Sequence, residues 1–195
     1  KNDKFSPTLT SKIGEALNPS IQAANKDAMD AYNAKNYVAA GPKFREVYDL
    51  LKATGQNNKL YLYYSAITYA LSPEKEKAIA TYNELINSNY TGVETTYTAK
   101  NKKNGQVESL DKATWDLMKR SDDYLDFKTE TTKSVEPELY ETNVALLNDL
   151  ARYDEAIALS DKGLAKFPSN AKLSELKGIA YFKSGKTDQF MESLK

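Results

Sequence analysis

Apolar and small residues recur along much of the chain at intervals of three and four, the spacing that places side chains on one face of an α-helix. Residues 35–51 read KNYVAAGPKFREVYDLL, and residues 151–170 read ARYDEAIALSDKGLAKFPSN. Each stretch has a Tyr three positions before an Ala, followed by helix-forming residues with this spacing. The pattern predicts a helix in each stretch and indicates that the chain repeats one unit.

Aligned on the residue that follows a predicted turn between two helices, the pattern extends to four copies. In the first three copies, residues spaced by four and then three share a helical face: Ala40, Phe44 and Val47; Ala78, Tyr82 and Leu85; Ala156, Ser160 and Gly163. Twelve positions before each turn-following residue stands a small or apolar residue: Ala28, Ala66, Val144 and Gly178. In the fourth copy Phe190 replaces the Ala, 34 residues after Ala156, and Ala40 and Ala78 are 38 apart. Such a period indicates stacked helical hairpins, and we expect the small residues to be buried between them.

Turn-forming residues agree with this division. Ser72–Pro73 predicts a helix start, with Ser72 as the N-cap and Pro73 at the first helical position. Pro137 is expected to open a helix, Pro168 to separate the last two copies, and Gly185 to form an interhelical turn. Pro42 lacks a backbone donor, so we expect it to loosen or kink the first turn of its helix.

The second and third copies are separated by an insertion. Ala78 and Ala156 are 78 residues apart, so roughly 40 residues are additional. Asn104–Gly105 between two β-prone runs predicts a β-hairpin with a two-residue turn, and DKATWDLMKR predicts a helix capped by Asp111. The next run, YLDFKTETTKSVE, is expected to be irregular. Trp115 is expected to anchor the insertion on the repeat helices, with a ligand contact as the alternative, and the insertion itself is either functional or a structural plug.

The segments LKGIAYFKSGK, ARYDEAI, Phe167–Pro168 and AITYALSPEKEKAIATYNEL resemble the tetratricopeptide repeat (TPR). The resemblance covers residues of about 21–90 and 136–195. It implies an all-α fold, an α-solenoid of about four helical hairpins, with a small β-hairpin plus helix insertion. The repeats would lie at about 21–54, 59–92, 137–170 and, truncated, 171–195, with the insertion at about 93–135, in a single domain over 1–195. No Trp opens any copy, and Gly41–Pro42 falls early in the second helix of the first.

The insertion after Tyr90–Gly92 resembles that of TPR proteins exported by certain Gram-negative bacteria. This resemblance implies a location in the periplasm or cell envelope, and the cytoplasm is the alternative. The sequence starts with Lys1 rather than Met, so we expect a processed or cut chain, from which any signal peptide would already be gone.

In a solenoid of helix pairs, the first helix of each pair lines a concave face. Helical wheels place the following residues on that face: Asn25, Met29, Tyr32, Asn33, Tyr63, Ile67, Leu71, Glu141, Ala145, Asn148, Glu175, Ile179 and Phe182. Aromatic, Asn and Met side chains suit adaptable peptide recognition. TPR co-chaperones that grip a terminal carboxylate use a Lys and an Asn one turn apart, but the matching positions here hold Asn25 and Met29, so no such clamp is expected. Of the clustered Tyr61, Tyr63 and Tyr64, we expect Tyr63 to be exposed and Tyr64 to pack in the core.

Composition narrows the chemistry. Lys plus Arg and Asp plus Glu number 27 each, so the basic excess typical of nucleic-acid binding is missing and no nucleic-acid partner is expected. The sequence has neither Cys nor His, which removes disulfides, sulfur-based zinc sites and Ser-His-Asp or Cys-His catalysis. We expect no cofactor, no metal and no enzyme, although chemistry by carboxylates, Lys or Tyr stays open. No run of about 18 apolar residues occurs, so no membrane span is expected.

These observations predict a non-catalytic scaffold that binds a protein or peptide on its concave face. The alternative is a module that binds a small ligand or glycan on an exposed Tyr-rich face. The fourth copy stops after about two turns of its second helix, so we expect the native chain to continue or this edge to pair with another molecule, including self-association.

Overall fold

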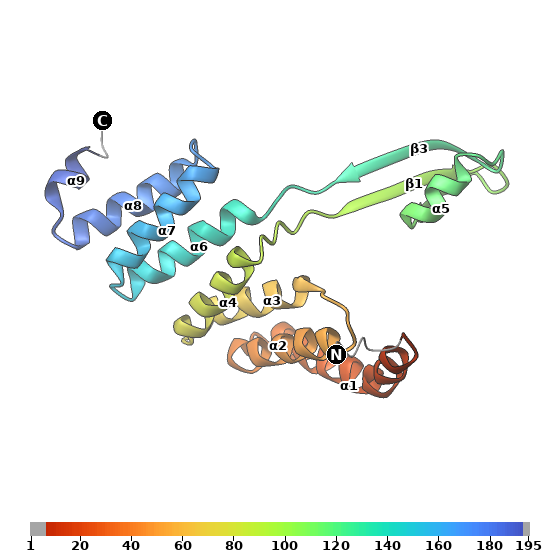
Figure 1. Ribbon diagram of the computed structural model, residues 1–195, viewed down its shortest axis with the longest axis horizontal. Helices are drawn as coiled ribbons and strands as arrows, with labels where there is room; N and C mark the ends of the chain where they lie inside the picture. The colour runs from red at the N-terminus through yellow and green to blue at the C-terminus, as the bar shows by residue number, and fades with distance from the viewer. Residues whose placement is uncertain (1–6, 193–195) are drawn as a thin grey trace, which may run out of the picture. The chain divides into compact units, whose positions relative to one another are not determined.

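The computed structural model describes residues 7–192 and shows a mostly helical fold with a small three-stranded antiparallel sheet (Figure 1). The described residues divide into two compact units, one formed by residues 7–90 and 136–192, the other by Thr91–Val135. The helical unit contains α1 (Pro7–Asn33), α2 (Tyr37–Ala53), α3 (Lys59–Ala70), α4 (Lys75–Asn87), α6 (Glu136–Asp149), α7 (Tyr153–Lys166), α8 (Ala171–Lys183) and α9 (Thr187–Glu192). The inserted unit contains β1 (Thr95–Asn101), β2 (Val107–Leu110), α5 (Lys112–Met118) and β3 (Tyr124–Thr131).

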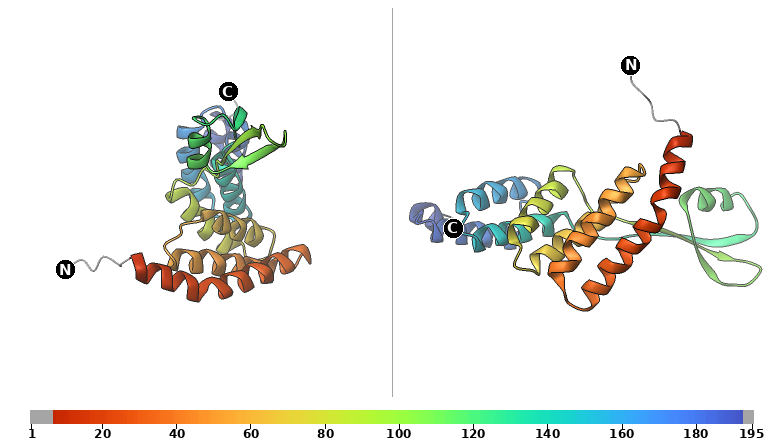
Figure 2. Two further views of the ribbon diagram at one scale, coloured as in Figure 1. Left: turned by 90° about the vertical axis from the view of Figure 1, so that its right-hand side faces the viewer. Right: turned by 90° about the horizontal axis from the view of Figure 1, so that it is seen from below.

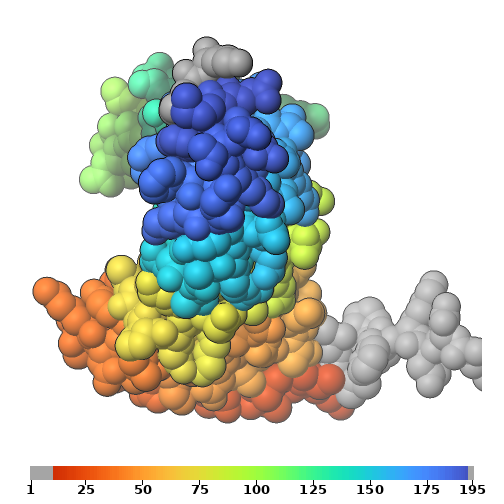
Figure 3. Space-filling model, turned by 90° about the vertical axis from the view of Figure 1, so that its left-hand side faces the viewer, coloured from red at the N-terminus to blue at the C-terminus, as the bar shows by residue number. Residues whose placement is uncertain are grey.

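In the helical unit each helix packs against the next one along the chain, and α4 packs against α6 across the insertion. Helix α6 also packs against α8, so the first helices of the last two hairpins are neighbours. Figure 2 shows α1, the longest helix with 27 residues, at one end of this row. Figure 3 views the row from the α8–α9 end. From this side the coloured segments of the helical unit follow one another roughly in chain order, from blue to red.

The small residues that define the repeat lie where the helices approach one another. Ala28, Ala66 and Val144 are 0% exposed, and Gly178 is buried as well, so the predicted burial of these four positions is confirmed. The turn-following residues of the first three copies, Ala40, Ala78 and Ala156, are also 0% exposed. Phe190, which replaces the Ala in the fourth copy, is only half-buried.

Helices α1, α6 and α8 end in the same turn. The second residue beyond the last helical one has a positive φ in each case: Lys35 (58°), Ala151 (57°) and Gly185 (75°). The next N–H donates back to a carbonyl in the last turn: Asn36 to Ala31 at 2.8 Å, Arg152 to Leu147 at 2.9 Å and Lys186 to Tyr181 at 3.0 Å. This pattern is the Schellman motif, which pairs the last carbonyls of a helix. The predicted turn at Gly185 is confirmed, and three copies share its geometry.

The second copy departs from this turn because Pro73 stands at the corresponding position. The proline ring locks φ near −65°, so a positive φ is excluded there. Helix α4 starts at Lys75 with Glu74 as its N-cap, and the hydroxyl of Ser72 accepts a hydrogen bond from the Glu74 N–H at 3.1 Å. The prediction that Ser72 caps a helix starting at Pro73 is therefore wrong by two residues.

Of the three other prolines with a predicted role, Pro137 and Pro168 behave as expected, whereas Pro42 does not interrupt its helix. Pro137 is the second residue of α6, and Pro168 lies between α7 and α8, which confirms both predictions. Helix α2 is continuous through Pro42. Pro42 lies close to the start of the helix, where the donor that it removes would have paired with the carbonyl of Val38 in an exposed turn.

The inserted unit is a sheet with strand order β2-β1-β3, all neighbours antiparallel. Residues 102–106 connect β1 to β2, and only Gly105 has a positive φ, of 72°. The hairpin is confirmed, but its predicted two-residue Asn-Gly turn is wrong, because Asn104 keeps a negative φ in a longer loop.

The segment predicted to be irregular forms β3, which pairs with β1 from Thr95↔Thr131 to Asn101↔Tyr124. The pairing shifts register opposite Ala99, and Asp126 takes a positive φ of 55° at that point. A bulge of this kind breaks the alternation of inward and outward side chains by which a strand is recognised in a sequence. The insertion is therefore a three-stranded sheet with a helix rather than a two-stranded hairpin with a helix.

Helix α5 covers this sheet through Trp115. The indole ring packs against Tyr97 and Phe127 at centroid distances of 5.2 and 5.8 Å, and its Nε1–H donates to the carbonyl of Thr98 at 3.0 Å. Asp111 caps the helix as predicted, accepting a hydrogen bond from the Thr114 N–H at 2.9 Å. The contacts of Trp115 lie in the core of the inserted unit itself, so the prediction that it anchors the insertion on the repeat helices is wrong.

Candidate functional site

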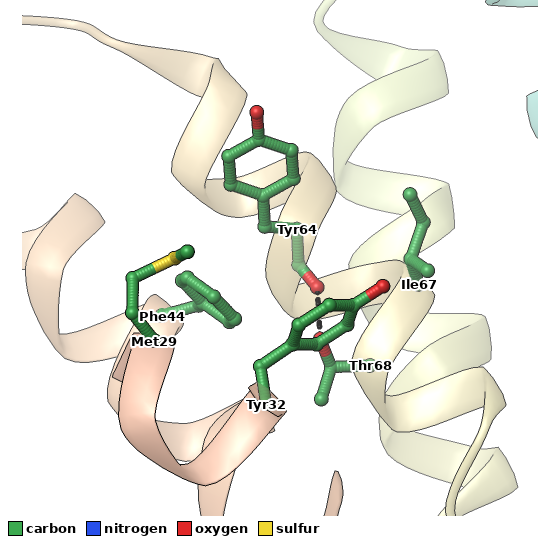
Figure 4. Close-up of a pocket in the computed structure, with 6 residues that line it drawn as sticks. All are labelled: Met29, Tyr32, Phe44, Tyr64, Ile67 and Thr68. Carbon is green, nitrogen blue, oxygen red and sulfur yellow. Dashed lines mark hydrogen bonds between the residues drawn. The ribbon is translucent and has the colours of Figure 1, made fainter. Parts of the chain in front are cut away.

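The helical unit contains a pocket of about 270 Å³ between α1, α2 and α3 (Figure 4). Its lining consists of aromatic, aliphatic and thioether side chains, and its side-chain polar groups are two phenol hydroxyls and one threonine hydroxyl: Met29, Tyr32, Phe44, Tyr64, Ile67 and Thr68. The first two come from α1, Phe44 from α2 and the last three from α3. The first helix of the first copy and the first helix of the second copy therefore both contribute to this cavity.

Helical spacing explains how the walls and floor form. Met29 and Tyr32 are three residues apart on α1, and Tyr64 and Ile67 are three residues apart on α3, so each pair lies on one side of its helix. Phe44 is only 2% exposed and belongs to the buried register of α2, which makes it the floor. The walls reach solvent, because Met29, Tyr32 and Tyr64 are 42%, 39% and 38% exposed.

The rings in the pocket meet at an angle. Tyr32 and Phe44 have centroids 6.2 Å apart with their planes at 69°, and Phe44 and Tyr64 are 5.5 Å apart at 57°. Tyr63 extends the series beyond the pocket, 6.5 Å from Tyr64 and 5.8 Å from Tyr90. Such edge-on and tilted contacts fix the rings against one another and leave a notch above the floor instead of a flat platform.

The polarity of the lining is low and its polar groups are few. Thr68 donates its hydroxyl hydrogen to the carbonyl of Tyr64 at 2.6 Å, so that hydrogen is already used. Within the described part of the chain, neither the Tyr32 nor the Tyr64 hydroxyl has a hydrogen-bond partner. Among the residues that the structure describes, no carboxylate, Lys or Arg lines the pocket. The lining offers apolar surface and two phenol donors, and it holds no acid–base pair.

Three of the residues predicted for the concave face, Met29, Tyr32 and Ile67, come together in this pocket. The lining residues that the sequence missed are Phe44, Tyr64 and Thr68. Tyr64 was expected in the core, yet its side chain is 38% exposed. The signal was present, because Tyr64 lies three and seven positions before Ile67 and Leu71, which were both predicted for this face.

Tyr63 was expected to be exposed, and this prediction is wrong. It is half-buried, and its hydroxyl donates to Glu138 Oε1 on α6 at 3.5 Å. Burial, with smaller contributions from the Glu138 charge and from Tyr90, raises the pKa of Tyr63 to about 12. The residue therefore connects α3 to α6 rather than facing a partner.

Two predicted site residues on α6 hold helices together. Asn148 is 5% exposed, and its Nδ2 donates to the carbonyl of Leu176 on α8 at 2.9 Å, so its placement on an accessible face is wrong. Glu141 is half-buried and accepts a hydrogen bond from Nδ2 of Asn170 at 2.7 Å. Both side chains lie at the junction of the third and fourth copies, where an unpaired amide or carboxylate would be costly.

The remaining predicted residues lie outside the pocket lining. Asn25, Ala145 and Ile179 are half-buried, Asn33 is exposed, and Leu71 is 53% exposed. Glu175 forms an exposed ion pair with Lys172 at 3.1 Å. Phe182 is 64% exposed and packs against Phe190 with centroids 5.3 Å apart. The structure thus brings together residues of the first two copies and leaves the others dispersed.

Elsewhere, no group of three or more Asp or Glu residues is arranged to hold a metal ion in the described residues. The helices of the same residues include none with the length and apolar character that crossing a bilayer requires. Compared with protein-family models, curated proteins and solved structures, the chain matches none of them.

Proposed function

We propose that the protein is a non-catalytic scaffold that binds a protein or peptide partner in the pocket between α1, α2 and α3. The observation that carries the proposal is the exposure of Met29, Tyr32 and Tyr64 around the buried ring of Phe44. Exposed apolar side chains that surround a cavity mark binding sites more often than chance surface positions do. Met and Tyr also adapt to varied side chains at low entropic cost.

The arrangement of the helices supports the interpretation of the helical unit as a repeat protein. The period between copies, the buried small residues and the Schellman turns shared by α1, α6 and α8 support a TPR-like α-solenoid. In such an architecture the first helices of successive pairs present a common face. The position of the pocket between α1 and α3 fits the use of that face for recognition.

The alternative, a glycan-binding module, is less compatible with the lining. A sugar ring carries several hydroxyl groups that need partners when it is taken out of water. The pocket supplies two phenols, while no side-chain amide, carboxylate or guanidinium group from the described part of the chain lines it. A peptide side chain, which can be wholly apolar, satisfies this lining better.

Two further predictions concern the location of the protein outside the cytoplasm and its self-association. Location in the periplasm or cell envelope rests on the resemblance of the insertion to that of exported TPR proteins. Self-association through the last hairpin is supported by the exposure of Phe182 and Met191, which are 64% and 57% exposed. Both stay predictions.

A random peptide library displayed on phage tests the proposed function. The library is selected on the wild-type protein, and the enriched peptides are then measured against Met29→Lys and Val38→Lys. Met29 lines the pocket, whereas Val38 is also an exposed apolar residue, 51% exposed, that does not line it. We expect Met29→Lys to weaken binding about tenfold or more and Val38→Lys to leave it unchanged.

The variants have accessible side chains, so the lysine can extend into solvent, and circular dichroism checks that both stay folded. Failure to enrich any peptide family, or equal binding to Met29→Lys and wild type, would overturn the proposal. Retention of oligosaccharides on a glycan array in place of peptides would favour the alternative function.

A further inference from the structure

The rim of the pocket, formed by the exposed ends of the Tyr32 and Tyr64 side chains, carries two hydrogen-bond donors that do not bond to any described residue. The hydroxyls of Tyr32 and Tyr64 belong to side chains that are 39% and 38% exposed. In Figure 4 the Tyr32 ring extends from α1 towards α3, and the Tyr64 hydroxyl lies at the end of its ring away from Phe44. Each phenol can therefore donate to a ligand while its ring contacts the apolar part of that ligand.

The charge and polarity of the lining indicate which kind of ligand is complementary to the pocket. No ionised side chain of the described residues 7–192 lines the cavity, so the part of a ligand that enters it must be uncharged to avoid an unpaired buried charge. Thr68 already donates to the Tyr64 carbonyl, which leaves phenol O–H groups as the available donors. A complementary ligand thus combines apolar surface with hydrogen-bond acceptors that are not already paired.

Backbone conformation decides which peptides have free acceptors. In an α-helix the carbonyls are bonded within the helix, apart from those of its last turn. A polyproline II segment has no internal hydrogen bonds, so every carbonyl is available to a donor. Proline also brings an apolar ring and no N–H, so a proline-rich segment needs only donors from the protein, which is what this rim offers.

The arrangement of the rings favours the same ligand. Phe44 forms a floor between Tyr32 and Tyr64, with interplanar angles of 69° and 57°, so the rings enclose a notch. Flat ligands stack on parallel, open rings, whereas a pyrrolidine ring fits a notch between tilted aromatic side chains. Aromatic-lined grooves are the general means by which proteins hold polyproline II segments.

We propose that the pocket binds an uncharged, proline-rich segment of a partner protein in the polyproline II conformation. Tyr32 and Tyr64 donate to main-chain carbonyls of the segment, while Met29, Phe44 and Ile67 contact its proline rings. This inference rests on the proposed function, because it specifies the class of peptide that the same pocket recognises.

Isothermal titration calorimetry with two blocked peptides of equal length tests the inference. One is oligoproline, and the other is an Ala- and Leu-rich peptide that forms a helix. The protein variants are Tyr32→Phe and Tyr64→Phe, which remove only the hydroxyls, with Tyr153→Phe on α7 as a matched control outside the pocket. We expect oligoproline to bind, each pocket variant to weaken it about 2- to 10-fold, and the control to bind as the wild type does.

Several outcomes would overturn the inference without touching the proposed function. These are binding of the helical peptide alone, and oligoproline binding that is lost in Met29→Lys but unchanged in both Phe variants. The inference is also overturned if neither of the two peptides binds. The phage selection reports separately whether any peptide binds, so failure of the proposed function is recognised by an empty selection and failure of this inference by the titrations.

Discussion

Replacing Gly163 by Ala sets helix propensity against packing, and the structure predicts which one dominates. Gly163 lies within α7, where Ala is intrinsically more favourable than Gly by about 1 kcal/mol. A Cβ at this position would, however, lie 2.5 Å from Cδ2 of Leu173 and 2.9 Å from Cδ1 of Tyr140. Both neighbours are 0% exposed, so neither can move into solvent to relieve the overlap.

Overpacking a close-packed core costs about 1–3 kcal/mol, and two overlaps with fully buried side chains place this site near the upper end. After the gain in propensity, we expect Gly163→Ala to lower the free energy of unfolding by about 1–2 kcal/mol. For a chain of this size that corresponds to a decrease in melting temperature of about 3–6 °C.

The assay is thermal and urea unfolding followed by far-UV circular dichroism, with Gly14→Ala as the matched control. Gly14 also lies within a helix, but a Cβ there would have no neighbour within 4 Å. The control should therefore gain up to about 1 kcal/mol, and the two substitutions should have opposite signs. A Gly163→Ala protein as stable as the wild type, or more stable, would refute the assignment of a close contact between α6, α7 and α8.

Three other expectations concern the turn, a tyrosine and a buried amide. Ala151→Gly should stabilise the protein by about 0.5–1 kcal/mol, because the φ of 57° at this position strains a residue with a Cβ. The control Ala158→Gly, inside α7, should instead destabilise the protein in urea unfolding. Changes of the same sign in the two free energies of unfolding would contradict the strain at Ala151. Because the pKa of Tyr63 is raised to about 12 from 10.0, folding stability should be intact below about pH 10 and fall between about pH 10 and 12. The urea midpoint of Tyr63→Phe should decrease less over that pH range than the midpoint of the wild type. The absorbance of tyrosinate can be titrated in both proteins, and the difference between the two curves reports Tyr63. If that difference contains no ionisation above about pH 10, the shift is refuted. Asn148→Ala removes the hydrogen bond to Leu176 and should cost about 1–2 kcal/mol by thermal unfolding, and an unchanged transition would show that this bond does not contribute.

The sequence was sufficient for the helical register. Ala28, Ala66, Val144 and Gly178 were identified by spacing alone, and their burial is confirmed. Periodicity succeeds here because a helix surface is a local property: residues three and four apart share a face whatever surrounds the helix. The Asp111 cap and the turn at Gly185 were readable for the same reason, since both depend on contacts within a few residues.

The failures occur where distant segments meet. The alternation of β3 is broken by the bulge at Asp126, and the strand is formed by pairing with β1, which lies about 30 residues earlier in the chain. Asn148 has the helical phase of a surface residue, but α8 covers it and Leu176 accepts its hydrogen bond. A wheel for one helix contains no information on which neighbour will cover that face.

The candidate site shows the same division. Periodicity placed Met29, Tyr32 and Ile67 on the first helices of their copies, which is as far as the local pattern reaches. That these residues share one cavity with Phe44 as its floor, and that Tyr64 rather than Tyr63 is exposed beside it, follows from the packing of α1, α2 and α3. The sequence determined the helices and their faces because these depend on near neighbours along the chain, whereas the pocket was decided by tertiary structure because it is the space that three packed helices leave between them.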